Sequence, residues 1–400
     1  MNIAICTRHI GSAAGTGADQ VVNNAFRALV THDHINTYFP YHEQLGKWGR
    51  SGLRATLAPL ISDILLKNLW IPQWAQHHHI DIHLHLAPPC IYVPTHIPQI
   101  CYIYDVPRGP DNARLCHRLF NDYIVRTSAH RTDHIIALTT AMKDDIISSY
   151  GILPERITVI HPCIDLGIFN LPNSGPKCNM PQELHDVKPG YMLGIVSRLV
   201  PRKNPAAYLE VFSRLPPAVR KKHKLVLRIP ADMHDLCQFV NTTRIQEIAP
   251  DIRFLKEPLD IQSIAALYQH AGVLLFPSHY EGFGLPIIEA LACGLRVVAS
   301  NIPACLEAGG TVASYHDPTD FAGMMAGCLK SLHEWQINQS FHAGHKHAEQ
   351  FSREAFASNM MNLFEAMTRS RPAANCVFRD ESATESGIEP ATHSGIEPAG

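Results

Sequence analysis

The segment HYEGFGLPIIEALACG, residues His279–Gly294, decides the fold of this 400-residue chain. The apolar run Val273–Phe276 precedes it and predicts a buried strand, and Ile287–Ala292 predicts a helix that Gly294 closes. Pro286 suits the first helical turn, where a missing N–H has no cost. A strand, a Gly-rich turn and a helix start together predict an α/β fold, and they offer free N–H groups to an anion such as a diphosphate.

Two carboxylates belong to this short element. Glu281 lies in the predicted turn and Glu289 lies about one helical turn inside the predicted helix, so both can point into one cleft. Gly282 and Gly284 are weak signals by themselves, because a tight turn with a solvent-facing glutamate explains them about as well. The segment alone therefore indicates an anion site and leaves its function open.

Short apolar runs alternate with helical patterns along most of the chain. The helical segments include Ala18–Leu29 and Ala141–Ser149. Such alternation predicts parallel sheets that are covered by helices on both faces. The predicted strands are Asn2–Cys6, Ile80–Leu86, Ile100–Tyr104, His134–Leu138, Thr158–His161, Met192–Val196, Leu225–Ile229, Ile252–Leu255, Val273–Phe276 and Arg296–Ser300.

A linker divides this pattern into two similar halves. The stretch Leu171–Pro189 is rich in proline and also holds glycine, asparagine and serine, which is typical of linkers. Two doubly wound domains place the carboxyl ends of both sheets at a shared cleft, where ligands bind. We therefore expect a domain at 1–170, a linker at 171–190, a second domain at 191–350, a further helix at 351–370 and a disordered tail at 371–400.

The composition argues against several classes of protein. Charged residues make up 18% of the chain and the net charge is -2, so no basic excess suggests nucleic acid. The 11 cysteines include no C-x-x-C pair, which fits reduced thiols in the cytosol and neither a disulfide framework nor a zinc site. The N-terminus lacks a signal-peptide pattern, and no apolar stretch reaches the ~18 residues of a membrane span. We expect a cytoplasmic protein.

Three local features have competing interpretations. The basic run Arg220–Lys224 is typical of a solvated loop between a helix and a strand, and a phosphate or lipid-headgroup patch is the alternative. His83 and His85 alternate with apolar residues, which predicts a strand edge; with His77–His79 they leave metal binding as a minor alternative. The apolar stretch Leu57–Trp74 predicts a buried helix of the first domain, and a helix resting on the inner face of a membrane is the alternative.

Taken with further motifs, the opening segment resembles the E-x7-E signature of the retaining glycosyltransferase family 4, also called glycosyl transferases group 1. The resemblance covers the chain to about Met367. It implies the GT-B fold, in which two doubly wound Rossmann-like parallel-sheet domains face a cleft, with the donor site mainly in the second domain and the acceptor site mainly in the first. The further motifs are ITVIHPCIDLGIF at Ile157–Phe169, SRLVPRK at Ser197–Lys203, ASNIP at Ala299–Pro303, EAGG at Glu307–Gly310 and FSREA at Phe351–Ala355.

The resemblance also implies roles for individual residues. Glu281 would hydrogen-bond the donor sugar, and Glu289 would hold the ribose hydroxyls of a GDP- or UDP-linked donor. Arg198 and Lys203 would bind the donor diphosphate and stabilise charge on the departing nucleotide. The backbone N–H groups of four consecutive residues would meet sugar and phosphate; these are Gly282, Phe283, Gly284 and Leu285.

The sequence around the two cations agrees with this role. Arg198 follows the predicted strand Met192–Val196 at its carboxyl end, and Lys203 lies near the next helix start at Pro205. Two cations at this place can neutralise a leaving diphosphate without a metal. By themselves, they fit a surface arginine and lysine beside a turn equally well.

A glycine-containing loop in the first half is a candidate contact for phosphate or acceptor. Gly15, Thr16 and Gly17 lie between the first predicted strand and helix, where glycines allow a ligand to approach the backbone closely. The loop does not match G-x-G-x-x-G, so the dinucleotide fingerprint is absent, and a flexible turn explains it as well.

The pair Tyr104-Asp105 departs from the family pattern, which often has His-Asp here. Tyrosine can donate a hydrogen bond but does not titrate near neutrality as histidine does. We expect Tyr104 to contact the sugar or the acceptor, and an ordinary strand-end residue is the alternative. His9 and His96 are candidates for the missing imidazole.

These features predict a retaining, metal-independent hexosyltransferase for a mannose- or glucose-type sugar. Its partners would be a nucleotide sugar and a glycan or lipid-linked acceptor, with no resident cofactor, in the synthesis of cell-surface polysaccharide such as lipopolysaccharide. The main rival is an inactive protein of the same fold that binds a nucleotide sugar as a partner subunit. A sugar-nucleotide epimerase is a further alternative, against which the E-x7-E and SRL-type motifs argue.

Overall fold

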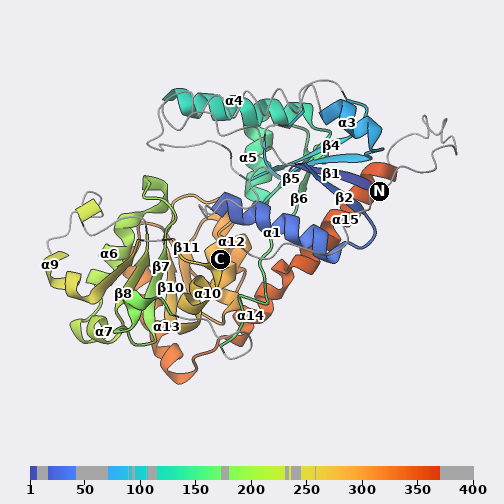
Figure 1. Cartoon of the computed structure of the whole chain (residues 1–400). Helices are drawn as coiled ribbons and strands as arrows, with labels where there is room; N and C mark the ends of the chain where they lie inside the picture. The colour runs from blue at the N-terminus through green and yellow to red at the C-terminus, as the bar shows by residue number, and fades with distance from the viewer. Residues whose placement is uncertain are drawn as a thin grey trace. The chain divides into compact units, whose positions relative to one another are not determined.

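The computed structural model shows two parallel β-sheets with their helices across most of the chain (Figure 1). The expected tail, the core of the expected linker and most of Leu57–Trp74 lie outside the described residues. By its contacts the chain forms two units, Met1–Met361 and Asn362–Gly400, and both sheets belong to the first. The described residues are 1–6, 17–41, 71–88, 90–91, 95–104, 106, 115–172, 180–229, 234–235, 245–256 and 258–369.

The first sheet has six parallel strands in the order β2-β1-β3-β4-β5-β6. Helix α5 shows why its helices begin and end where they do: the Thr139 side chain accepts a hydrogen bond from the Met142 N–H, and Gly151 ends the helix in the left-handed conformation. The strands are β1 (Asn2–Cys6), β2 (Thr37–Tyr41), β3 (Ile82–His85), β4 (Gln99–Ile103), β5 (His134–Ala137) and β6 (Ile157–Val159), and the helices are α1 (Gly17–His32), α3 (Ile71–His77), α4 (Leu115–Arg131) and α5 (Thr140–Tyr150).

The second sheet is also parallel, in the order β12-β11-β10-β7-β8-β9. Its strands are β7 (Tyr191–Ile195), β8 (Leu225–Arg228), β9 (Ile252–Leu255), β10 (Ala271–Phe276), β11 (Val297–Ser300) and β12 (Ser314–His316). The helices that follow are α6 (Pro205–Ser213), α7 (Pro217–Lys222), α9 (Ile245–Ile248), α10 (Ile261–His270), α11 (Leu285–Ala292), α12 (Pro303–Gly309), α13 (Phe321–Ile337), α14 (His342–Ala348) and α15 (Arg353–Arg369).

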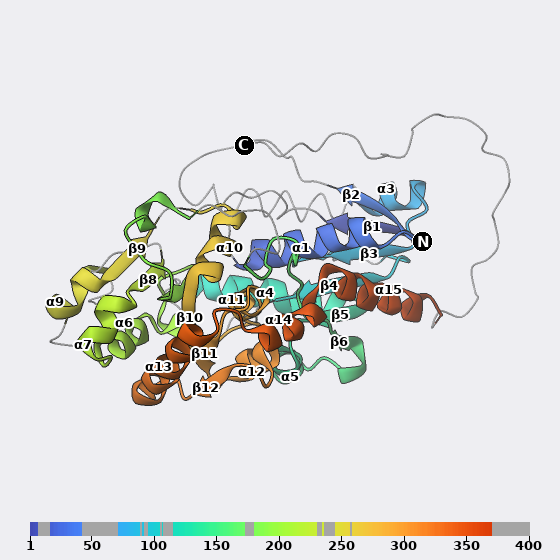
Figure 2. The same ribbon diagram turned by 90° about the horizontal axis from the view of Figure 1, so that it is seen from below.

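Helices cover both faces of the second sheet, as the strand–helix alternation predicts. Side chains of α6 and α13, such as Phe212 and Leu332, pack with Leu227 and Leu275 of the strands in one buried cluster. Helices α10 and α11 contact β10 as well, and Figure 2 shows α10 and α13 on opposite sides of it. Burial on both faces explains why these strands are continuous apolar runs.

All ten predicted strands are present, with ends that differ by at most two residues. The sequence analysis did not predict β2 and β12, each of which is one of the two edge strands of its sheet. Strand β2 has the sequence TYFPY, in which Pro40 is tolerated because an edge strand has an unpaired side. Strand β12 has three residues, none of them fully buried. Neither segment has the apolar run that the prediction relied on.

The expectation that His83 and His85 mark a strand edge is wrong. Strand β3 lies inside the sheet between β1 and β4, and both imidazoles are fully buried. Their rings lie 6.2 Å apart, and the Nε2 atom of His85 lies 3.1 Å from the Gln99 side-chain oxygen. Because a parallel sheet is covered on both faces, alternation within it does not expose one set of side chains. Burial also lowers the pKa of His83 to about 4.

Two other local expectations are settled in part. Within Arg220–Lys224, Arg220 is buried and donates to the carbonyl oxygens of Ser213 and Leu215, so this arginine is structural. Where Leu57–Trp74 enters the described residues, Ile71 is buried in a core cluster and Trp74 packs against it. No helix among the described residues is both long enough and apolar enough to cross a membrane.

Candidate functional site

The Gly-rich turn between β10 and α11 requires its glycines. Gly284 precedes α11 with a φ of 113°, in a region of backbone conformation that side chains disfavour. A Cβ atom on Gly282 would lie 2.7 Å from the carbonyl oxygen of Tyr104, so only glycine fits against the end of β4. The Thr139 hydroxyl donates to the Gly282 carbonyl oxygen at 3.3 Å. The turn is thus held close to residues that follow β4 and β5.

Glu281 is fixed in this turn by two partners. The Lys203 ammonium donates to both carboxylate oxygens, at 2.6 Å to Oε1 and 2.5 Å to Oε2. The Ser278 hydroxyl donates to Oε1 at 2.7 Å. The side chains of Lys203 and Glu281 are 16% and 8% exposed, so this is a largely buried ion pair.

The loop after β7 is bonded to the same turn. Asn204 follows the short 3-10 helix Pro201–Lys203 in the left-handed conformation. Its amide donates to the carbonyl oxygens of Pro277 at 3.0 Å and Pro318 at 2.9 Å. The His279 N–H donates to the Arg202 carbonyl oxygen at 2.8 Å. These bonds hold Lys203 where it meets Glu281.

Glu289 lies in the second turn of α11 and is 4% exposed. The Tyr268 hydroxyl donates to its Oε2 atom at 2.7 Å, and Tyr268 is itself fully buried. Burial raises the pKa of the Glu289 carboxyl to about 7, while the Tyr268 hydrogen bond and the positive charge of Arg228 act in the opposite direction. A carboxylate with such a pKa changes charge close to neutral pH.

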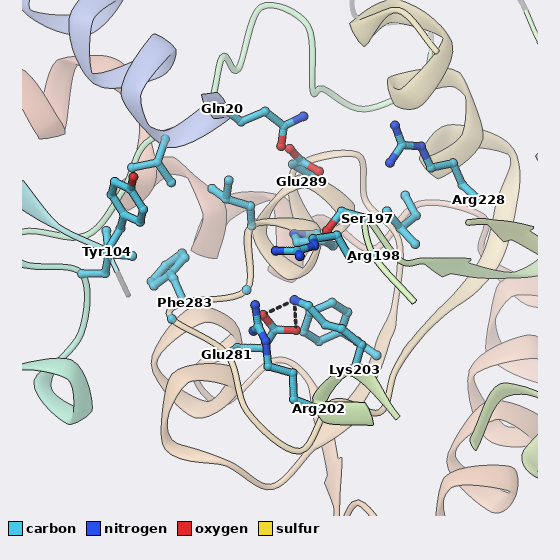
Figure 3. A pocket seen from close by; sticks show the side chains of 18 of the residues that line it. Gln20, Tyr104, Ser197, Arg198, Arg202, Lys203, Arg228, Glu281, Phe283 and Glu289 are labelled. Carbon is cyan, nitrogen blue, oxygen red and sulfur yellow. Dashed lines mark hydrogen bonds and ion pairs between the residues drawn. The ribbon is translucent and has the colours of Figure 1, made fainter. Parts of the chain in front are cut away.

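A cavity of about 340 Å³ brings the predicted site residues together (Figure 3). In Figure 3 the Lys203–Glu281 pair lies at one end, Glu289 lies at the other, and Arg198 lies between them. Arg198 is exposed, so its charge is open to a ligand. The predicted residues that line the cavity are Tyr104, Arg198, Lys203, Glu281, Gly282, Phe283, Gly284, Leu285 and Glu289.

The other candidate site residues all belong to the first half of the chain. Gly15, Thr16, Asp105 and His9 lie outside the described residues. Gly17 begins α1, and Gln20 of the same helix lines the cavity. His96 is also absent from the lining residues, and no group of metal-ligating side chains occurs among the parts of the chain that the structure describes.

Among the lining residues that the sequence analysis did not assign to the site, three have long polar side chains: Gln20, Arg202 and Arg228. Arg228 is the last residue of β8, which pairs with β7 at Ile195. The carboxyl ends of neighbouring parallel strands meet at one edge of a sheet, so a charged residue ending a predicted strand was a usable signal. Gln20 carried no such signal, because it lies on a helix of the first half.

The EAGG motif has a clear structural role. The Glu307 carboxylate accepts hydrogen bonds from the Thr140 N–H at 2.9 Å and the Ala141 N–H at 3.3 Å, both in the first turn of α5. A carboxylate at this place satisfies helix N–H groups that lack partners. Through these hydrogen bonds the motif connects α12, the helix that follows β11, to α5 of the first half.

Two family models match the chain. The model "Glycosyltransferase Family 4" matches residues 17–167, and the model "Glycosyl transferases group 1" matches residues 179–311. The chain belongs to glycosyltransferase family 4. The second match contains Arg198, Lys203, Glu281 and Glu289, the charged residues at the centre of the cavity.

Curated relatives match this family 4 protein over part of their length. D-inositol 3-phosphate glycosyltransferase 2 of Catenulispora acidiphila is 30% identical over 221 residues, which are 50% of this chain and 49% of that protein. The O-antigen chain mannosyltransferase B of Escherichia coli is 32% identical over 238 residues, which are 58% of this chain and 60% of that protein. The matched region thus spans about half of the length of these relatives.

Solved structures establish the fold of the family 4 protein as GT-B. Sucrose-phosphate synthase from Thermosynechococcus elongatus superposes with a TM-score of 0.68 at 16% identity and covers 93% of this chain and 100% of that one. HepE of Anabaena, in complex with UDP and glucose, gives a TM-score of 0.62 at 16% identity and covers 92% and 100%. At this identity the likeness concerns the fold alone.

Proposed function

We propose that this protein is a retaining glycosyltransferase that moves a mannose- or glucose-type hexose from a nucleotide sugar to a glycan or lipid-linked acceptor. The observation that carries the proposal is the single cavity in which the Lys203–Glu281 pair, Arg198 and Glu289 meet. Family membership supports a common role for these residues in donor binding. Their cations are complementary to a diphosphate, and their carboxylates can accept hydrogen bonds from the hydroxyls of the sugar and the ribose. We place the reaction in the cytoplasm, in the synthesis of cell-surface polysaccharide.

The cations would act on the leaving group. Bond cleavage at the anomeric carbon transfers negative charge to the departing diphosphate, and fixed positive charges stabilise that change. An ammonium has three N–H donors, of which Lys203 uses two for Glu281, so one remains for a phosphate oxygen. The guanidinium of Arg198, in the loop after β7, would bind the same diphosphate. These two charges are the basis for proposing that no metal is needed.

The carboxylates would orient the two ends of the donor. Glu281 cannot turn freely, since Lys203 and Ser278 hold it, and it would accept a hydrogen bond from a sugar hydroxyl. Glu289 keeps its Oε1 atom for the ribose hydroxyls, because Tyr268 occupies Oε2. Fixing both ends places the anomeric carbon against an acceptor hydroxyl and supplies part of the rate acceleration.

Tyr104 favours one rival function. It lines the cavity at the place where family members often have a histidine, and a tyrosine side chain in general does not titrate near neutral pH as an imidazole does. The rival is a protein that binds a nucleotide sugar and acts as a partner subunit without transferring the sugar.

A two-stage experiment separates these functions. The purified protein is first screened for thermal stabilisation by nucleotide sugars, since a ligand that binds the native state raises the unfolding temperature. Stabilising donors are then incubated with the protein, release of the nucleoside diphosphate is followed by chromatography, and the anomeric configuration of the product is determined by NMR. Stabilisation with turnover and retention supports the proposal, stabilisation without turnover supports the binding protein, and inversion contradicts the retaining mechanism.

A further inference from the structure

Arg228 is a partly buried cation in the cavity to which the proposed mechanism gives no role. Its backbone ends β8 and pairs with β7 at Ile195, which brings its side chain to the cavity. Within the described part of the chain, its guanidinium makes no hydrogen bond and no ion pair. A guanidinium has five N–H donors, so a partly buried one without protein partners points to a ligand.

The position of Arg228 separates it from the other charges of the site. In Figure 3 its side chain lies on the side of Glu289, away from the Lys203–Glu281 pair. Its positive charge acts to lower the pKa of the Glu289 carboxyl and of the Tyr268 hydroxyl. Tyr268 rather than Arg228 holds Glu289, so the guanidinium stays available although a carboxylate is near.

The direction of the donor then decides what Arg228 meets. This step rests on the proposed function, in which Glu289 holds the ribose and Glu281 holds the sugar. The diphosphate lies between these two, beside Arg198 and Lys203, so Arg228 lies on the nucleoside side of the cavity. The group within its reach beyond the ribose is the base.

We infer that Arg228 recognises the base of the donor and selects guanine. An arginine side chain can only donate, and its two parallel N–H groups match two neighbouring acceptors. Guanine presents such a pair in O6 and N7, whereas adenine offers N7 beside an amino donor and a uracil-type base offers O4 without a second acceptor beside it. The donor class is therefore a guanosine diphosphate sugar.

The test compares the affinity for three nucleotides, GDP, UDP and ADP, by calorimetry. The wild-type protein should bind GDP roughly tenfold or more tightly than the other two, which is the usual discrimination of a bidentate arginine–guanine contact. Arg228→Ala should lose this preference and keep its affinity for UDP. Arg228→Lys retains the charge but not the two parallel donors of the planar guanidinium, so it should reduce the preference without abolishing it.

Arg198→Ala is the matched comparison, because it should weaken all three nucleotides alike through the diphosphate. The inference is overturned if the wild-type protein does not prefer GDP, or if Arg228→Ala weakens all three nucleotides equally, which would make Arg228 a phosphate ligand. If none of the three nucleotides binds, the proposed function itself fails, and that result is distinct from binding without a preference for guanine.

Discussion

Strand β3 of the first sheet and helix α11 of the second half each bury a titratable side chain, and the two cases differ instructively. His83 is fully buried, and neither of its ring nitrogens has a hydrogen-bond partner among the described residues, whereas Glu289 is 4% exposed and accepts from Tyr268. Burial favours the neutral form of both side chains: it lowers the pKa of His83 to about 4 and raises the pKa of Glu289 to about 7. Glu289 lines the cavity together with other charged groups, and His83 is not among the described residues that line it. A perturbed pKa therefore does not distinguish a site from a core, and the arrangement of partners does.

The largest effect on the free energy of unfolding is expected from breaking the Lys203–Glu281 ion pair, which lines the same cavity as Glu289. Lys203→Ala leaves the carboxylate of Glu281 largely buried without its cation. Removing one partner of such a pair costs about 3 kcal/mol or more in the free energy of unfolding. Urea denaturation measures this change.

Lys330→Ala is the control for that variant. Its side chain is 79% exposed and its ammonium lies 4.0 Å from the Glu334 carboxylate, so its loss should change the free energy of unfolding by less than about 0.5 kcal/mol. Equal effects of the two substitutions would show that the Lys203–Glu281 pair is no stronger than a surface pair.

The next effect concerns His83. Its folded pKa of about 4 lies below the ordinary value of 6.5, so the unfolded chain binds the proton more readily. The contribution is fully present above pH 6.5 and is lost as the pH falls toward 4, by on the order of 3 kcal/mol. The variant His83→Leu lacks this group and should lose less stability over that interval. Urea denaturation at pH 7 and at pH 4 measures the difference, and identical losses in the two proteins would contradict the buried neutral imidazole.

A smaller effect is expected at Tyr268. Tyr268→Phe removes the hydrogen bond to Glu289 and should cost about 1–3 kcal/mol of stability. Because that bond lowers the pKa of Glu289, its loss should raise the pKa further above 7. In the proposed function, donor binding needs the ionised carboxylate of Glu289. As the pH is lowered, the variant should therefore lose donor affinity at a higher pH than the wild-type protein does. Calorimetric titrations between pH 5.5 and 8.5, roughly 1.5 units to either side of that pKa, follow this midpoint.

Tyr191→Phe is a matched control for this shift. Tyr191 is also fully buried, but its hydroxyl donates to a backbone oxygen, that of Leu267 at 2.8 Å, and not to Glu289. It should cost similar stability without moving the pH midpoint of donor binding. A midpoint that moves equally in both variants would mean that Glu289 does not control donor binding.

The same comparison shows how far the sequence can predict the structure. The apolar runs predicted ten strands, because buried parallel strands must be apolar on both faces. They could not predict that the histidines of β3 are buried, since the order of strands in a sheet is set by tertiary packing. Motif spacing identified charged residues of the cavity, which lie after the neighbouring strands β7 and β10 and in α11. Gln20 reaches the cavity from a helix of the first half, and no local pattern encodes that approach.

The most direct test of the account is sugar transfer by Arg198→Ala. The donor that stabilises the wild-type protein is used, and release of the nucleoside diphosphate is measured for the wild-type protein, for Arg198→Ala and for Arg214→Ala. Arg214 is the control because its side chain is 46% exposed and pairs with Glu210 on the surface. The account predicts that Arg198→Ala lowers turnover by about 10²–10³-fold, as expected when one fixed group that stabilises developing charge is removed, while Arg214→Ala keeps wild-type turnover. Full activity in Arg198→Ala would contradict a donor site built around this cavity.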